Sequence, residues 1–61
     1  MEAYDKLLKI VQEAAEDVKR AEGGNKAAGT RVRKAMQDVK NLAQEIRVGI
    51  LDLRTDENES P

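Results

Sequence analysis

Positively charged side chains gather in one short stretch of this 61-residue chain. Residues 26–34 hold two lysines and two arginines and no acidic residue, namely Lys26, Arg31, Arg33 and Lys34. Ammonium and guanidinium groups bind phosphates and carboxylates, because each carries a full charge and several N–H donors. The whole chain has a formal net charge of −1, so positive charge is concentrated here. Such segregation indicates a surface for a polyanion or an acidic partner.

A second set of cations is spaced by seven residues. Arg33, Lys40 and Arg47 align along one side of a helix, and none has an acidic residue three or four positions away to pair with. The sequence therefore predicts six residues that contact a polyanion or an acidic partner: Lys26, Arg31, Arg33, Lys34, Lys40 and Arg47. The alternative is an ordinary solvated face, neutralised across the fold by Glu13, Glu16 or Asp17.

Catalytic and metal-binding side chains are scarce. The chain has no Cys and no His, so it lacks a thiolate ligand, a Cys nucleophile and the usual general base. Its one serine, Ser60, has no base nearby. We therefore expect neither enzyme activity nor a metal or cofactor.

The length of the chain allows one small domain. A chain of this size buries only ~60% of its unfolded surface, and with no disulfide available the remaining remedy is association with a second copy. No signal or transit peptide is recognisable, and no apolar run approaches the ~20 residues that span a bilayer. We expect a cytoplasmic protein that does not enter a membrane.

Apolar spacing predicts two amphipathic helices. The first pattern has apolar residues at 4, 7, 8, 11, 14, 15, 18 and 21, and predicts a helix over about 2–22 with one continuous apolar stripe. Gly23 and Gly24 suit its termination, and Asn25 suits the N-cap of the next helix. The second pattern predicts a helix over about 26–53, interrupted by Gly49. Residues 54–61 lose the periodicity, and we expect an acidic, disordered tail after a helical domain over 1–53.

The predicted fold is all-α: an antiparallel helical hairpin that dimerises into a four-helix bundle. One long helix bent at the glycines is the alternative. Two helices alone cannot cover so wide a stripe, so a second copy is expected to complete the core. The expected dimer core consists of Leu7, Val11, Val18, Val32, Met36, Val39, Leu42 and Ile46.

Charge is unevenly distributed along the chain. Residues 1–22 have a net charge of −2, residues 23–51 of +4 and residues 52–61 of −3. In a hairpin, Lys19 and Arg20 would lie beside the cationic segment, while both termini would lie at the other end. The hairpin is therefore expected to have a positive tip at its turn.

The segment Gly24-Asn25-Lys26-Ala27-Ala28 followed by Arg31-Val32-Arg33 resembles the start of the second helix in bacterial linker-histone-like nucleoid proteins. The specific likeness covers 24–34, and a looser one covers about 4–53. The resemblance implies DNA binding in the nucleoid, with the helices serving for self-association. Members of that family continue into a Lys-rich tail, whereas Asp56, Glu57 and Glu59 make this tail acidic.

Two functional hypotheses remain at this point. The first is a homodimeric, histone-like nucleoid protein that binds DNA through phosphates, weakly (~10⁻⁴–10⁻⁶ M) and with a steep salt dependence. The second is a helical module that oligomerises or docks a protein without binding nucleic acid, which the near-neutral net charge favours.

Overall fold

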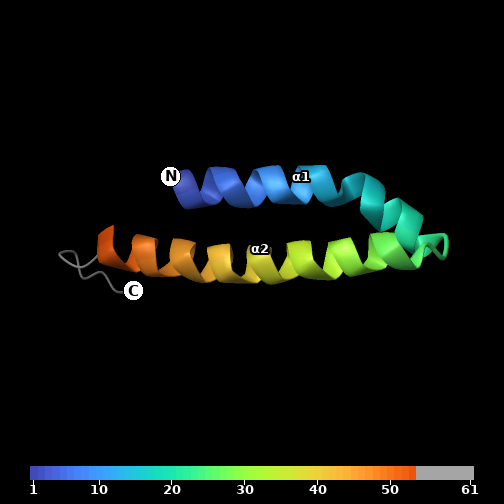
Figure 1. Ribbon diagram of the computed structural model, residues 1–61. Helices are drawn as coiled ribbons and strands as arrows, with labels where there is room; N and C mark the ends of the chain where they lie inside the picture. The colour runs from blue at the N-terminus through green and yellow to red at the C-terminus, as the bar shows by residue number, and fades with distance from the viewer. Residues whose placement is uncertain (54–61) are drawn as a thin grey trace.

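The computed structural model describes residues 1–53, which form two helices joined by a tight turn. Helix α1 spans Glu2–Glu22 and helix α2 spans Lys26–Leu53, as the apolar spacing predicts. They run antiparallel side by side (Figure 1), and the molecule measures 49 × 17 × 15 Å. The hairpin is thus confirmed and the single bent helix is excluded. The tail expected over 54–61 lies outside the described residues.

The turn is built from backbone hydrogen bonds around two glycines. Gly24 has φ 103°, a left-handed conformation that glycine adopts without a steric penalty. Its N–H donates to the carbonyl of Ala21 at 3.0 Å, and the N–H of Asn25 donates to that of Arg20 at 3.0 Å. This pair of bonds is the Schellman ending of a helix.

Asn25 then begins α2 as its N-cap. Its side-chain Oδ1 accepts a hydrogen bond from the backbone N–H of Ala28 at 2.9 Å. The first turn of a helix leaves N–H groups without partners, and this bond satisfies one of them. The same asparagine therefore closes α1 through its backbone and opens α2 through its side chain, which sets the direction of the reversal.

The helices meet along a seam of residues spaced alternately by three and four. On α1 the partly or fully buried positions are Ala3, Leu7, Ile10, Ala14, Asp17 and Ala21. On α2 they include Ala28, Val32, Ala35, Val39, Leu42 and Ile46. This spacing is that of left-handed helix pairs.

The continuous stripe expected on α1 is divided in the folded hairpin. Leu7, Ala14 and Ala21 turn towards α2, whereas the neighbouring apolar positions do not. The side chains left exposed include Tyr4 (53%), Leu8 (42%), Val11 (43%) and Val18 (36%). The reason is geometric. The apolar stripe of α1 is wide enough to contact two neighbouring helices, and α2 covers only the half that faces it.

The core of the hairpin is therefore very small. Among residues 1–53 only Ala14 and Ala28 are buried, and no large side chain is fully enclosed. Small residues also allow close approach near the turn, where Ala21 lies against Gly29 and α1 bends towards α2 (Figure 1). At the open end the Cε atom of Met1 lies 3.1 Å from where a Cβ on Gly49 would be, and α2 extends beyond α1.

Candidate nucleic-acid interface

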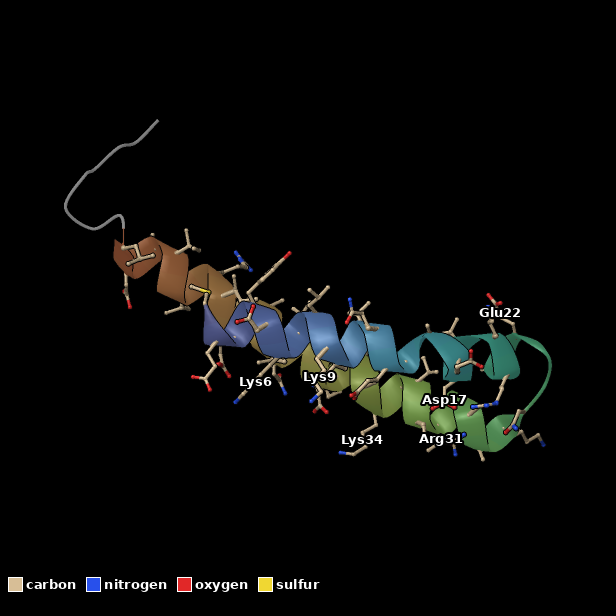
Figure 2. All side chains as sticks on the ribbon, turned by 90° about the horizontal axis from the view of Figure 1, so that it is seen from above. Lys6, Lys9, Asp17, Glu22, Arg31 and Lys34 are labelled. Atoms are coloured by element: carbon tan, nitrogen blue, oxygen red, sulfur yellow. The ribbon has the colours of Figure 1, made fainter. Side chains whose placement is uncertain are left out.

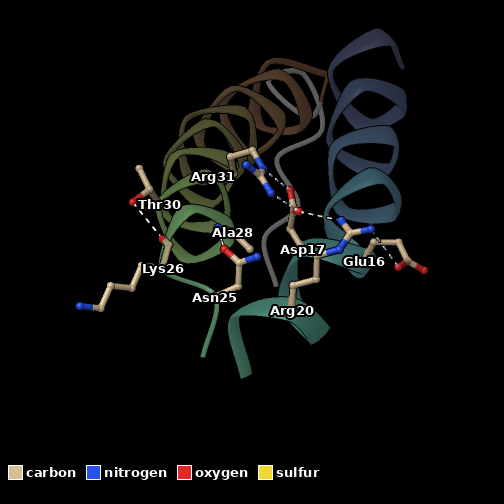
Figure 3. Close-up of polar contacts among 8 residues, drawn as sticks. All are labelled: Glu16, Asp17, Arg20, Asn25, Lys26, Ala28, Thr30 and Arg31. Atoms are coloured by element: carbon tan, nitrogen blue, oxygen red, sulfur yellow. Dashed lines mark hydrogen bonds and ion pairs between the residues drawn. The ribbon is translucent and has the colours of Figure 1, made fainter. Parts of the chain in front are cut away.

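Arg31 is held by an acidic residue from the other helix. Its Nε donates to Oδ2 of Asp17 and its Nη2 donates to Oδ1, both at 2.9 Å (Figure 3). Two parallel bonds between a guanidinium and a carboxylate form the strongest and most directional ion-pair geometry. This contact joins α1 to α2 beside the turn, across 14 positions of the chain.

Asp17 also receives a second arginine. Nη1 of Arg20 lies 3.2 Å from Oδ1 of Asp17, and its Nη2 lies 3.8 Å from Oε1 of Glu16. The Asp17 side chain is only 19% exposed, whereas that of Arg31 is 56% exposed. The bond from Arg31 lowers the pKa of Asp17 below its usual value, helped by the charges of both arginines and opposed by partial burial. The same bond raises the pKa of Arg31.

These pairs correct one prediction about the cationic segment. Arg31 was counted among the unquenched cations and is paired with Asp17 of α1, whereas Arg20 pairs with Glu16 as their spacing of four residues predicts. The turn end also carries Glu16 and Glu22, which reduce its positive charge without cancelling it, because residues 16–34 hold six cations and three acidic residues. The sequence pattern missed this because Asp17 is distant along the chain and meets Arg31 only once the hairpin forms.

The other five candidate cations have a different environment. Each is exposed on α2 and has no ion pair with any residue in the 1–53 range: Lys26, Arg33, Lys34, Lys40 and Arg47. No acidic residue occupies the first turn of α2, so nothing there offsets Lys26. Unpaired positive charge therefore extends along α2, from Lys26 beside the turn to Arg47.

The five cations do not form one patch. Residues seven apart share a side of a helix, so one row contains Lys26, Arg33, Lys40 and Arg47, and we call the last three of them the α2 column. Lys34 instead lines a shallow groove of about 400 Å³ between the helices. The other residues of the groove are Ile10, Glu13, Ala14, Asp17, Arg31, Ala35 and Asp38.

Two lysines that the sequence did not single out lie on the side of Lys34. Lys6 and Lys9 of α1 project from the same edge as Lys34, while Glu22 points to the opposite one (Figure 2). Glu2 and Asp5 lie four residues before Lys6 and Lys9, a spacing that favours intrahelical ion pairs, so the charge pattern did not mark these lysines as candidates. The structure has no such pair at Lys6 or Lys9, nor one between Lys34 and Asp38, within the described helices. The expected pair of Glu16 with Arg20 is present.

The described residues offer little for other chemistry. Residues 1–53 hold no group of three acidic or other ligating side chains that could bind a metal ion. Neither described helix combines the length and the apolar character needed to cross a bilayer. The two helices present exposed long cationic side chains that are available for binding.

Comparison with known proteins gives one informative result. The model of the family described as histone H1-like protein Hc1 matches residues 1–56, which is most of the chain. No curated protein and no solved structure matches this chain. The matched range contains both helices and every one of the cations described above. The chain belongs to the histone H1-like Hc1 family, a family of structural, DNA-binding nucleoid proteins.

Proposed function

We propose that the hairpin binds duplex DNA without sequence preference, through phosphate contacts made by cations of α2. The observation that carries the proposal is that Lys26, Arg33, Lys34, Lys40 and Arg47 are exposed and lack ion pairs within residues 1–53. Membership of a histone H1-like family supports DNA as the polyanion. Arg31 lies with Lys34 in the groove and contributes less, because Asp17 already occupies its guanidinium.

The form of these side chains favours phosphates over base edges. Residues of the α2 column are spaced about 10 Å apart along a straight helix, at ~1.5 Å per residue. Duplex DNA presents a charge every ~1.7 Å of its axis, so such a row meets phosphates in any register. The chain offers no Trp or Phe, so base stacking has no platform beyond Tyr4.

The salt dependence of binding measures how many of these cations act together. If only the three residues of the α2 column contact one duplex, the plot of log K against log salt has a slope of about −2.7. Engagement of all five cations would steepen that slope to about −4.5. Because Lys34 lies on the groove side while Lys26 continues the row of the α2 column, we expect four contacts and a slope of about −3.6 for one hairpin.

A fluorescence anisotropy titration at about 50 and 200 mM salt tests the proposal, with a variant that separates charge placement from net charge. Replacing Arg33, Lys40 and Arg47 by Gln removes three positive charges from the α2 column. We expect at least a tenfold loss of affinity and a flatter salt slope.

The matched control removes three positive charges from α1, by replacing Lys6, Lys9 and Lys19 with Gln. A clearly smaller loss for this control places binding on α2. Equal losses would show that net charge alone governs binding and would overturn the assignment. Absence of binding by the unmodified protein at low salt would reject DNA binding altogether.

The functional unit of this proposal is a homodimer. Val11, Val18 and Met36 of the expected dimer core are 43%, 36% and 40% exposed in the hairpin, so they are available to a second copy. The other expected core residues are half-buried between the helices of one copy, and a second copy would bury them further: Leu7, Val32, Val39, Leu42 and Ile46. Sedimentation gives the mass directly, and a monomer at all concentrations would reject the dimer.

The exposed apolar side chains also favour a second candidate function, a helical module that only associates with proteins. It predicts a stable assembly that shows no DNA affinity at about 50 mM salt. The titration above distinguishes the two functions, since only the first loses binding when the α2 column is neutralised. Retention of a protein partner after nuclease treatment would support the second. Nucleoid association within the cytoplasm is the location that the first function requires.

A further inference from the structure

An unpartnered seam of apolar residues extends along α1 next to the one that contacts α2. Its members are spaced alternately by four and three, and all are exposed: Tyr4, Leu8, Val11, Ala15 and Val18. This is the spacing by which helices pack in coiled coils and bundles. We call it the outer seam of α1. Its length equals most of the helix, so it suits another long helix better than a short peptide.

Helix α2 contributes apolar residues to the same side of the hairpin. Met36 (40% exposed) and Ile50 (42% exposed) follow the half-buried residues Ala35 and Gly49 by one residue, as Tyr4 and Leu8 follow Ala3 and Leu7. A step of one residue turns a helix by about 100°. Because the helices are antiparallel, the same turn on each brings these residues to one face of the hairpin, and the α2 column lies along the outer edge of that face.

We infer that this face binds a second copy of the chain with both turns at the same end, so that α1 of each copy packs on α2 of the other. The inference rests on the proposed dimer and adds its topology. The symmetry is a two-fold axis parallel to the helices. Only Ala14 and Ala28 are buried in the single hairpin, which leaves the small core to be completed by this contact.

Side-chain sizes match in this arrangement. A two-fold axis along the helices keeps every residue at its own height, so levels within one hairpin also hold between copies. Ala21 lies level with Gly29 and Met1 with Gly49. Counting back along α1 and forward along α2 brings Ala15 within one residue of the level of Met36. The same count pairs Leu8 with Ala43, so a large side chain faces a small one in each case.

Charges along the edges favour the same topology. Asp5 and Glu22 lie within about one turn of the levels of Arg47 and Lys26, so opposite charges border the contact of α1 with α2 of the second copy. The reverse topology, with turns at opposite ends, stacks α2 on α2. It would press the two α2 columns together, including Lys40 against its own copy. Unpaired like charges at such an interface are repulsive.

Disulfide formation tests the topology, because the chain has no native Cys. Two single variants, Ala15→Cys and Met36→Cys, are unfolded together, refolded as a mixture and oxidised with glutathione. We expect a mixed disulfide between them as the main product, identified by intact mass. A disulfide needs Cα atoms closer than about 7 Å, which the diagonal pairs of a bundle do not reach.

Val11→Cys is the converse probe, because Val11 meets its own copy only when the turns lie at opposite ends. We expect oxidation of this variant to give no disulfide-linked dimer. Efficient self-linking of Val11→Cys, with none between positions 15 and 36, would overturn the topology while leaving the dimer intact. Circular dichroism of each variant before oxidation confirms that it is folded.

A distance measurement gives an independent result. A spin label on Glu22→Cys lies beside the turn, at an exposed position. With the turns together, helices α1 are diagonal neighbours and the labels are about 20 Å apart. With the turns at opposite ends, the separation exceeds about 30 Å. A long distance overturns the inference, whereas a monomeric protein with no dipolar signal overturns the proposed dimer beneath it.

Discussion

The two ends of the hairpin are held in different ways. At the turn, contacts are directional: a Schellman ending, the Asn25 cap and the two-bond pair of Asp17 with Arg31. Both buried residues, Ala14 and Ala28, lie in that half of the structure. At the open end the contacts are apolar and incomplete, with Tyr4 and Ile50 about half exposed.

This difference separates what one copy specifies from what it leaves to a partner. Hydrogen bonds and ion pairs near the turn fix the direction and register of the hairpin without help. The apolar surface towards the open end and along the outer seam has no such closure, and burying it requires another chain. The residues near the turn therefore set how α1 and α2 align, whereas the apolar residues elsewhere are the ones that a larger core would need.

The largest expected effect comes from a charge in the seam towards the open end. Leu42→Asp places a carboxylate between the helices, where Leu42 is half-buried. We expect a loss of about 2–4 kcal/mol, enough to unfold or dissociate so small an assembly. Circular dichroism with sedimentation measures both outcomes. Gln44→Asp, an exposed change on the same helix, is the control, and an unchanged assembly for Leu42→Asp would refute the seam.

Asp17→Asn tests the directional contacts at the turn. Arg31 lowers the pKa of Asp17 in the folded state, so the charged pair stabilises the fold above the unfolded pKa of about 3.9. That contribution is lost as the pH falls through the lowered value. We expect the variant to be less stable than the native protein at pH 7, and the difference to vanish in strong acid.

The control for this pH profile is Glu16→Gln, which removes only the longer 3.8 Å contact with Arg20. An exposed ion pair of this kind contributes little to stability. Thermal unfolding followed from pH 2 to 7 gives the profile of all three proteins. A difference at Asp17 that persists unchanged at the lowest pH would show that shape, not charge, is responsible.

A smaller effect is expected at the N-cap of α2. Asn25→Ala removes the acceptor of the Ala28 N–H and should lower stability by about 1 kcal/mol. Chemical denaturation measures it. Asn41→Ala, an exposed change in the middle of α2, is the control and should be neutral or slightly stabilising. Equal losses at the two positions would show that the cap is dispensable.

The smallest effect is expected at Gly49, and its sign is opposite. Alanine favours a helix by up to about 1 kcal/mol over glycine, and the new Cβ would meet only the flexible end of Met1, at 3.1 Å. We expect Gly49→Ala to raise the free energy of unfolding by a few tenths of a kcal/mol. A clear loss in the same denaturation assay would show that the open end is packed more tightly than we infer.

Much of this arrangement follows from local sequence. Helix limits follow from apolar spacing and from Gly23, Gly24 and Asn25, because caps and periodicity act over a few residues. The pairing of Arg31 could not be predicted from spacing, since Asp17 approaches it only through the fold. The division of the α1 stripe was likewise hidden, because periodicity shows that residues are apolar and not which partner covers them.

The bond of Asp17 with Arg31 also has a consequence for how the chain folds. It closes a loop of only 14 residues, so the entropy lost in forming it is small. Contacts farther from the turn join residues that are more distant in sequence. Each contact already formed lowers the entropy lost in forming the next one. We expect the hairpin to zip from Asn25 outwards within microseconds to milliseconds, with the termini of the helices meeting last. For the proposed dimer, we expect association of two folded hairpins to be the slow, concentration-dependent step.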